Sequence, residues 1–149
     1  MASTTIYNVK AALLTKLQAA SDLSGIQVVY ADPGAAERRE SIFLGEVDSS
    51  NQIPESFGTG RRRRLEEYTV DVLVCVQSKA AGVQEAESRA VTLASYVEDV
   101  VADNPQLTGS VTGLMFVECS GMSMSQGEAG IDGPRVVCTV RFHVKARLS

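Results

Sequence analysis

Two segments of the chain carry apolar residues at the spacing of an amphipathic helix. The first apolar stripe consists of Ile6, Val9, Leu13, Leu17 and Ala20. The second consists of Ala86, Ala90, Leu93, Val97 and Val100 or Val101. Three or four residues separate successive members, which is the repeat of one helix face. Both segments are therefore predicted to be helices with one buried side.

The ends of these helices are also marked in the sequence. Thr4 or Thr5 can cap the start of the first helix, and the Ser-Gly pair at residues 24–25 can end it. The second helix is expected to stop near Asn104, because the residue before Pro105 is steered away from helical backbone angles.

Strict alternation of apolar and more polar residues marks the clearest strand, residues 68–77. Its apolar positions are Tyr68, Val70, Val72, Val74 and Val76. A period of two places all five on one face of a strand, so we expect that face to be covered by both helices. Similar patterns predict strands at residues 26–30, 41–47, 114–119 and 135–147. One face of the last strand is basic, since it carries Arg141, His143, Lys145 and Arg147.

The order of these elements predicts an α+β fold. We expect an antiparallel or mixed sheet of about five strands, with both helices packed on one face. The last two strands follow each other directly, which favours antiparallel pairing. A chain of 149 residues with 44% hydrophobic and 21% charged residues is expected to form one globular domain over residues 1–149.

Two stretches between the predicted strands are long, residues 48–64 and residues 120–134. Each exceeds the roughly 12–15 residues above which structureless connections become uncommon in compact domains. The second stretch is rich in Ser and Gly and contains Met122 and Met124, whose unbranched side chains adapt to irregular contacts. We expect both stretches to be loops that act as arms over neighbouring subunits, with these two methionines at the interface.

Arg61, Arg62, Arg63 and Arg64 form a run of positive charge immediately before the clearest strand, although the protein carries a net charge of −4. Three interpretations remain open for this arginine run. It can be a solvated strand end that discourages aggregation, a surface that docks onto acidic groups of a neighbour, or a non-specific contact for nucleic-acid phosphates. A nuclear localisation signal also fits such a run. The acidic net charge argues against a dedicated nucleic-acid-binding protein.

The sequence shows no arrangement of residues typical of a metal site. Cys75, Cys119 and Cys138 lie far apart in predicted strands, and His143 is the only histidine. A structural zinc site needs about four such ligands at short spacing. We expect no metal and three reduced thiols, which fits a reducing compartment.

Catalytic and cofactor motifs are also missing from the sequence. The Gly-Thr-Gly segment at residues 58–60 lacks the third glycine and the following helix of a dinucleotide-binding turn. Glu66 and Glu67 are adjacent in a predicted strand, so their carboxylates point to opposite faces and cannot act as a pair. We therefore expect no enzymatic activity and no cofactor.

The sequence contains no segment typical of secretion or of a membrane span. Its N-terminus has no basic region followed by an apolar one. No apolar run approaches the roughly 18 residues of a transmembrane helix. We expect a protein made in the cytoplasm that does not enter a membrane.

Several segments together resemble the tail terminator proteins of long-tailed bacteriophages. They are residues 28–33, 42–47, 62–72 and 97–107, in the same order of predicted elements. The similarity extends over nearly the whole chain and is one of style and spacing. Only the arginines at the strand entry and the long loop before them correspond individually.

This resemblance implies a structural protein of the virion, located at the head-proximal end of the tail and present in the host cytoplasm during assembly. Its subunits would form a homohexameric ring that caps the tail tube, stops tube polymerisation and joins the tail to the head. The implied partners are the tail tube protein, the head-tail connector or stopper protein, and genomic DNA passing through the lumen.

Three other functions remain compatible with the sequence. Another neck or tail component, such as a head-completion or stopper protein, shares the size and composition and differs in its partners. A small cytosolic α+β binding module or dimeric regulator would present the same elements. An enzyme with its substrate at a subunit interface is the third alternative.

Overall fold

The computed structural model describes residues 4–47, 50–54, 64–78, 82–126 and 133–148. The chain begins with helix α1 (Ile6–Ala19) and continues through strands β1 (Gln27–Val29), β2 (Glu40–Leu44), β3 (Ser50–Pro54) and β4 (Arg64–Gln77). Helix α2 (Val83–Asp103) and strands β5 (Leu114–Gln126) and β6 (Arg135–Leu148) follow. Short 3₁₀ turns lie at Ser21–Leu23, Gly34–Ala36 and Leu107–Gly109.

The strands form one mixed sheet in the order β1-β2-β4-β6-β5, with β3 also paired to β4. The β1–β2 pair is parallel and every other pair is antiparallel. This is the α+β fold predicted from the sequence. The sheet has six strands where about five were expected, because β3 was not predicted.

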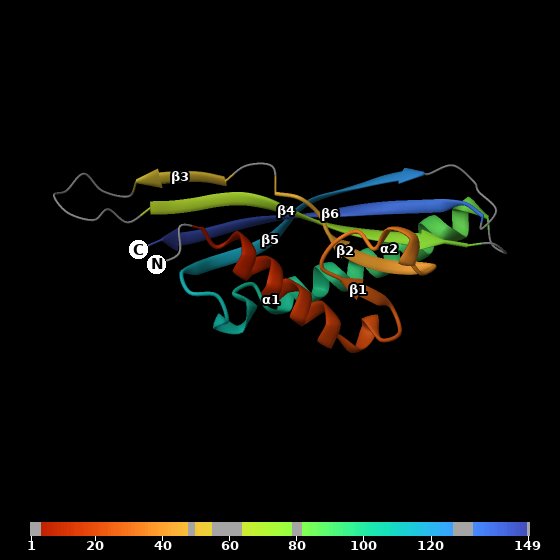
Figure 1. Ribbon diagram of the computed structural model, residues 1–149, viewed down its shortest axis with the longest axis horizontal. Helices are drawn as coiled ribbons and strands as arrows, with labels where there is room; N and C mark the ends of the chain where they lie inside the picture. The colour runs from red at the N-terminus through yellow and green to blue at the C-terminus, as the bar shows by residue number, and fades with distance from the viewer. Residues whose placement is uncertain (1–3, 48–49, 55–63, 79–81, 127–132, 149) are drawn as a thin grey trace.

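β2 and β3 lie end to end along the same edge of β4. Ile42 of β2 pairs with Val74 of β4, and Asn51 of β3 pairs with Glu67 of β4. Both strands run antiparallel to β4. β3 and β4 therefore form a hairpin whose connection is residues 55–63. In Figure 1 this hairpin extends beyond the helices at one end of the molecule.

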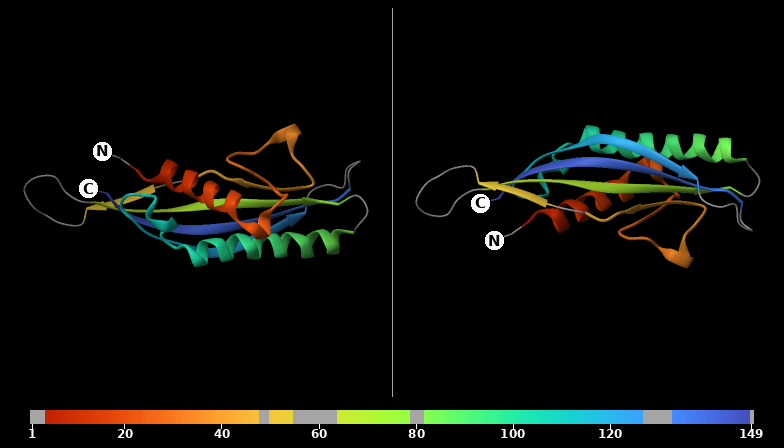
Figure 2. Two further views of the ribbon diagram at one scale, coloured as in Figure 1. Left: turned by 90° about the horizontal axis from the view of Figure 1, so that it is seen from below. Right: turned by 90° about the horizontal axis from the view of Figure 1, so that it is seen from above.

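Both helices cover the same face of the sheet, as the sequence predicts. Figure 2 shows α1 and α2 side by side in front of the strands in one view and behind them in the opposite view. The apolar residues of β4 face these helices, and Val70, Val72 and Val74 are fully buried. No helix within the described residues lies on the opposite face of the sheet, called here the helix-free face (Figure 2).

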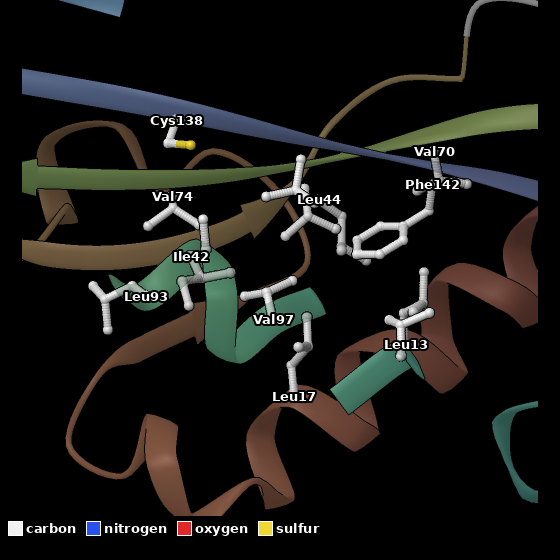
Figure 3. Packing of buried hydrophobic residues seen from close by; sticks show 14 of the residues in the cluster. Leu13, Leu17, Ile42, Leu44, Val70, Val74, Leu93, Val97, Cys138 and Phe142 are labelled. Atoms are coloured by element: carbon white, nitrogen blue, oxygen red, sulfur yellow. The ribbon is translucent and has the colours of Figure 1, made fainter. Parts of the chain in front are cut away.

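The core consists of side chains from both helices and from the central strands. Figure 3 shows them converging between the helices and the sheet. Its fully buried members include Val9, Leu13, Leu17, Ile42, Leu93, Val97, Val140, Phe142 and Val144. Most are aliphatic, so burial of branched side chains supplies the main stabilisation of the fold.

Both stretches that the sequence predicted as long loops contain strand. β3 lies within residues 48–64, and β5 continues to Gln126, well into residues 120–134. Their Ser, Asn, Gln and Gly residues have low strand propensity, but main-chain pairing with β4 and β6 holds them extended. The connections shorten to residues 55–63 and 127–134, so the expectation of two long loops was wrong in extent.

Candidate assembly interface

The base of the β3–β4 hairpin is joined to the start of α1 by a buried carboxylate. Glu66 is fully buried and accepts hydrogen bonds from Thr4 Oγ1 at 2.5 Å, Thr5 Oγ1 at 2.7 Å and the Thr5 backbone N–H at 2.8 Å. Thr5 is the N-cap residue of α1. Carboxylates are stabilised at helix N-termini by unpaired N–H groups and by the helix dipole. Glu66 therefore fixes the hairpin against the helix layer.

Tyr68 completes this buried network. Its hydroxyl lies 2.9 Å from Thr5 Oγ1. Since Thr5 gives its single hydroxyl proton to Glu66, the Tyr68 hydroxyl is the donor in this bond. Burial raises the pKa of Tyr68 well above its usual value, so the phenol keeps that proton at neutral pH.

Arg64, the last member of the arginine run, begins β4. It pairs with Pro54 of β3 and with Leu148 of β6 across the sheet. Its guanidinium donates to the Gln52 side-chain oxygen at 2.7 Å on the exposed surface. Arg61, Arg62 and Arg63 lie outside the described residues. Of the arginine run, the structure places Arg64 at the first residue of β4.

Met122 and Met124 lie on β5 at the edge of the sheet. They pair with Val140 and Cys138 of β6, so their side chains point to the helix side. Even so, 43% of the Met122 surface and 40% of the Met124 surface are exposed. The structure thus places both methionines on the surface, on a strand and not on a loop.

Helix α2 adds a third apolar side chain to this edge. Gln126 Nε2, at the end of β5, donates to Glu87 Oε1 at 2.6 Å. Val91 lies one helical turn after Glu87 on the same side of α2 and is 46% exposed. We call Val91, Met122 and Met124 the edge patch. Val91 was missed in the sequence because its exposure depends on how α2 packs.

The helix-free face of the sheet carries charges of both signs in matched rows. On β6, Arg141 Nε lies 3.8 Å from Asp71 Oδ1 of β4, and Lys145 Nζ lies 3.6 Å from Glu67 Oε1. His143 Nε2 lies 3.9 Å from the other oxygen of Glu67. These partly exposed pairs contribute little to stability. The acidic side chains of β4 nevertheless offset the positive charge of the basic residues that the sequence shows on β6.

A shallow polar depression of about 450 Å³ lies on this helix-free face. Its walls include Glu46, Asn51, Thr69, Asp71 and His143. His143 Nε2 has no hydrogen-bond partner within the described residues, and the His143 ring stacks on Phe116 with centroids 6.0 Å apart. No nucleophile is hydrogen-bonded to this imidazole there, so the depression lacks the base–nucleophile pair of covalent catalysis.

The three cysteines are free thiols spread over three strands. Cys75 and Cys138 are buried and Cys119 is partly exposed. Burial raises the pKa of Cys75 to about 12, although the nearby Arg135 guanidinium opposes this shift. Burial also raises the pKa of Cys138. At neutral pH these two sulfurs are thiols and poor nucleophiles.

Metal ligands and membrane spans were sought in the described parts of the chain. There, no three His, Cys, Asp or Glu side chains come together in a way that could hold a metal ion. Neither helix in those parts combines the length and apolar character needed to cross a membrane.

No family model matches this sequence, and no curated protein matches it either. Among solved structures, the chain is similar to one from a structure described as the virion of a native gene transfer agent particle. The match has a TM-score of 0.56 at 20% sequence identity and covers 97% of this chain and 100% of the other. The two chains therefore share a fold over nearly their whole length.

Proposed function

We propose that this protein is a structural, non-enzymatic component of a phage-like particle, and that it acts as a ring-forming tail terminator. The observation that carries the proposal is the shared fold with a virion chain, which extends over the full length of both proteins. The resemblance of the sequence to tail terminators independently favours the same class. The proposed ring is a homohexamer at the head-proximal end of the tail, formed from a single-domain subunit.

The positions of the exposed features support a ring. The β3–β4 hairpin lies at one edge of the sheet, whereas the edge patch lies on β5 at the other edge. A closed ring requires two different surfaces on each subunit, so that one copy's first surface meets its neighbour's second. Opposite edges of one sheet meet this requirement.

The charge distribution supports protein partners over DNA as the ligand of the arginine run. Arg64 lies on the hairpin of an acidic protein, next to the exposed side chain of Gln52. We propose that Arg61, Arg62, Arg63 and Arg64 dock onto acidic groups of an adjacent subunit or of the tail tube protein. DNA would pass through the lumen without sequence-specific contacts, and the head-tail connector or stopper protein would bind the opposite face of the ring.

Electron microscopy and tail length test this proposal together. The purified protein, alone or with tail tubes, should form rings of one size with six-fold symmetry. Particles produced without the protein should carry overlong tails that do not join heads. Dimers instead of rings would favour a regulator, and normal tail length with failed head joining would favour a stopper or head-completion protein.

A further inference from the structure

The outer edge of β5 is covered along its first half and uncovered along its second. The Val117 N–H donates to the Pro105 carbonyl at 2.7 Å, so the segment after α2 covers the first half. A register shift between Cys119 and Gly121 ends that half. Along residues 121–126 no described strand pairs with the outer edge.

The direction of the backbone groups along this edge follows from the hydrogen bonds inside the sheet. The Gly45 N–H donates to the Asp71 carbonyl at 2.7 Å, so the backbone of Asp71 points toward β2. Its partner Arg141 therefore points toward β5, because such pairs alternate in antiparallel sheets. Alternation then directs the main-chain N–H and C=O groups of Met122 and Met124 outward, away from β6.

β3 presents a second outer edge on the other side of the sheet. The same alternation directs Asn51 and Ile53 toward β4, and the other three residues of β3 toward the outer edge. No described strand pairs with that edge. β1 also lies at this side of the sheet, but it is only three residues long and the Gln18 side chain already donates to its Val28 carbonyl at 3.0 Å.

Neither outer edge carries the charged side chains that commonly prevent edge-to-edge pairing, although β3 ends in Pro54, which has no N–H to donate. Neither residues 121–126 nor β3 contains a charged residue, although 21% of the chain is charged. Natural edge strands commonly carry lysine or another charge for this purpose. Each edge instead exposes apolar side chains, with Ile53 52% exposed on β3 and the edge patch beside β5.

We propose that residues 121–126 of one subunit pair with β3 of the next, so that the sheet continues from copy to copy. This inference rests on the proposed ring and names the contact that closes it. β3 and β5 run in opposite directions within the subunit, because each antiparallel step from β3 through β4 and β6 to β5 reverses the chain. If neighbouring subunits have the same orientation, residues 121–126 of one and β3 of the next therefore run antiparallel. Antiparallel pairing is slightly more stable per residue than parallel pairing.

The register of this contact follows from overlap and from side-chain faces. Two registers overlap all five residues of β3, one with residues 121–125 and one with residues 122–126. Only the second pairs side chains of the same face, and it places Ile53 opposite Ser123. Ile53 pairs with Leu65 and Ser123 pairs with Thr139, both on the helix-free face, so the two side chains lie on one face of the joined sheet. This is a pair without mutual main-chain hydrogen bonds, in which the side chains approach most closely.

The contact also sets the tilt of the strands in the ring. β3 pairs with residues 64–68 of β4. Residues 121–126 of β5 pair with β6 residues whose partners on β4 are residues 71–76. Joining them shifts the neighbour along the strand direction by about 25 Å, given the rise per residue of a strand. A ring without a helical rise absorbs such a shift by tilting its strands against the ring axis, as closed barrels do.

Disulfide trapping tests the pairing in the full-length protein. Ile53→Cys and Ser123→Cys are combined in a Cys119→Ser background, which leaves only the buried Cys75 and Cys138. On mild oxidation of assembled rings we expect a ladder of linked subunits on a non-reducing gel. The matched control combines Ile53→Cys with Met122→Cys, whose side chain lies on the helix side and cannot meet the required disulfide geometry.

A proline substitution tests the main-chain contribution separately. Met124→Pro removes an outward N–H without breaking a hydrogen bond to β6, and proline is tolerated at such edge positions. The subunit should stay folded, while the concentration for half-assembly should rise about tenfold or more. Met124→Ala, which keeps the N–H, should assemble within about threefold of the unmodified protein.

The outcomes separate this inference from the proposed function. Linked ladders from the Ile53–Ser123 pair alone, with weaker assembly of Met124→Pro, support the edge contact. Rings that yield no ladder, or that assemble equally well with Met124→Pro, overturn the edge contact and leave the ring itself standing. A protein that stays monomeric with tail tubes present overturns both.

Discussion

Glu66 acts as a structural residue that holds α1 on the sheet. Its carboxylate is fully buried and accepts three hydrogen bonds from Thr4 and Thr5 at the start of the helix. Charge-assisted bonds of this kind are about twice as strong as neutral ones. Its sequence neighbour Glu67 lies on the helix-free face with Lys145. Adjacent carboxylates therefore have different roles because a strand alternates its faces.

Removing the Glu66 carboxylate should destabilise the fold. In Glu66→Ala the Thr5 N–H and hydroxyl lose a buried acceptor, so we expect the free energy of unfolding to fall by about 2–4 kcal/mol. Denaturant unfolding followed by circular dichroism measures this. Glu67→Gln is the control on the other face and should change stability by less than about 1 kcal/mol. Equal effects of the two substitutions would show that the network contributes nothing specific.

A charge introduced at Val72 should be still more damaging. Val72 is fully buried beneath the helices, so Val72→Asp places an unpaired carboxylate in the core and should cost about 4 kcal/mol or more. Thr69→Asp tests the same charge at an exposed position of the same strand and should cost no more than about 1 kcal/mol. Unchanged thermal stability of a soluble Val72→Asp variant would contradict the assignment of faces.

At the scale of elements, the β3–β4 hairpin and the second half of β5 carry the features that point outward. The hairpin extends past the helix layer (Figure 1), and its strand β4 begins with Arg64, the last member of the arginine run. The end of β5 carries Met122 and Met124 beside α2. The core is supplied by buried side chains of the central strands, β4 included, and of both helices. Assembly can therefore depend on the exposed side chains of these two elements, whereas the stability of the subunit depends on their buried ones.

Replacing the arginine run should separate assembly from folding. With serine at Arg61, Arg62, Arg63 and Arg64, stability should stay within about 0.5 kcal/mol, because exposed charges contribute little. Particle assembly with this variant should give overlong tails or tails without heads. The four-lysine variant keeps the charge and should recover part of the function, but not the planar two-point contacts of arginine. Normal tails with serine would leave the run as a solvated strand end, and defective DNA passage alone would move its role to the lumen.

Hydrogen exchange along β5 should alternate in the free subunit. The amides of Ser123 and Ser125 point to β6 and should exchange slowly, whereas those of Met122 and Met124 point outward and should exchange fast. Ring formation should slow the outward amides and leave the inward ones unchanged. Amide-resolved exchange by NMR or mass spectrometry measures this. Slow exchange of Met122 and Met124 in a verified monomer would show that the edge is already covered.

At the scale of the whole molecule, one face of the sheet is covered by helices and the other is open. The open face has matched acidic and basic rows, such as Asp71 with Arg141 and Glu67 with Lys145. It is therefore not the strongly basic surface that would attract DNA. Such a surface fits the proposed ring, whose lumen would let DNA pass without holding it.

Salt should weaken the ring without dissolving it. Charge contacts of the arginine run are screened as the Debye length falls from about 10 Å at 0.1 M salt to about 3 Å at 1 M. We expect the concentration for half-assembly, measured by analytical ultracentrifugation, to rise over this range. The serine variant should show a much smaller change. Equal salt dependence of both proteins would mean that the arginines do not contribute to ring formation.

Much of the architecture could be predicted from local patterns. The stripes of α1 and α2, the end of α2 at Asn104 and the buried face of β4 are confirmed by the structure. These features follow from periodicity and from the restriction that Pro105 imposes, both of which are local. The exposed side of the last strand is also where the alternation of β6 predicts it.

Other features could not be predicted because they depend on pairing across the sheet. β3 and the end of β5 have the composition of loops, and only their ladders with β4 and β6 make them strands. The same pairing gives the basic row of β6 its acidic partners. Arg61, Arg62 and Arg63 lie outside the described residues, so their docking stays a prediction.

The sequence by itself determined the buried faces of α1, α2 and β4, since those faces follow from the spacing of apolar side chains along each element. Tertiary structure decided which edges of the sheet remain open. An open edge is defined by the absence of a neighbouring strand, and that absence depends on the order of all the strands in the sheet. For that reason the proposed assembly contact could be located only in the folded subunit.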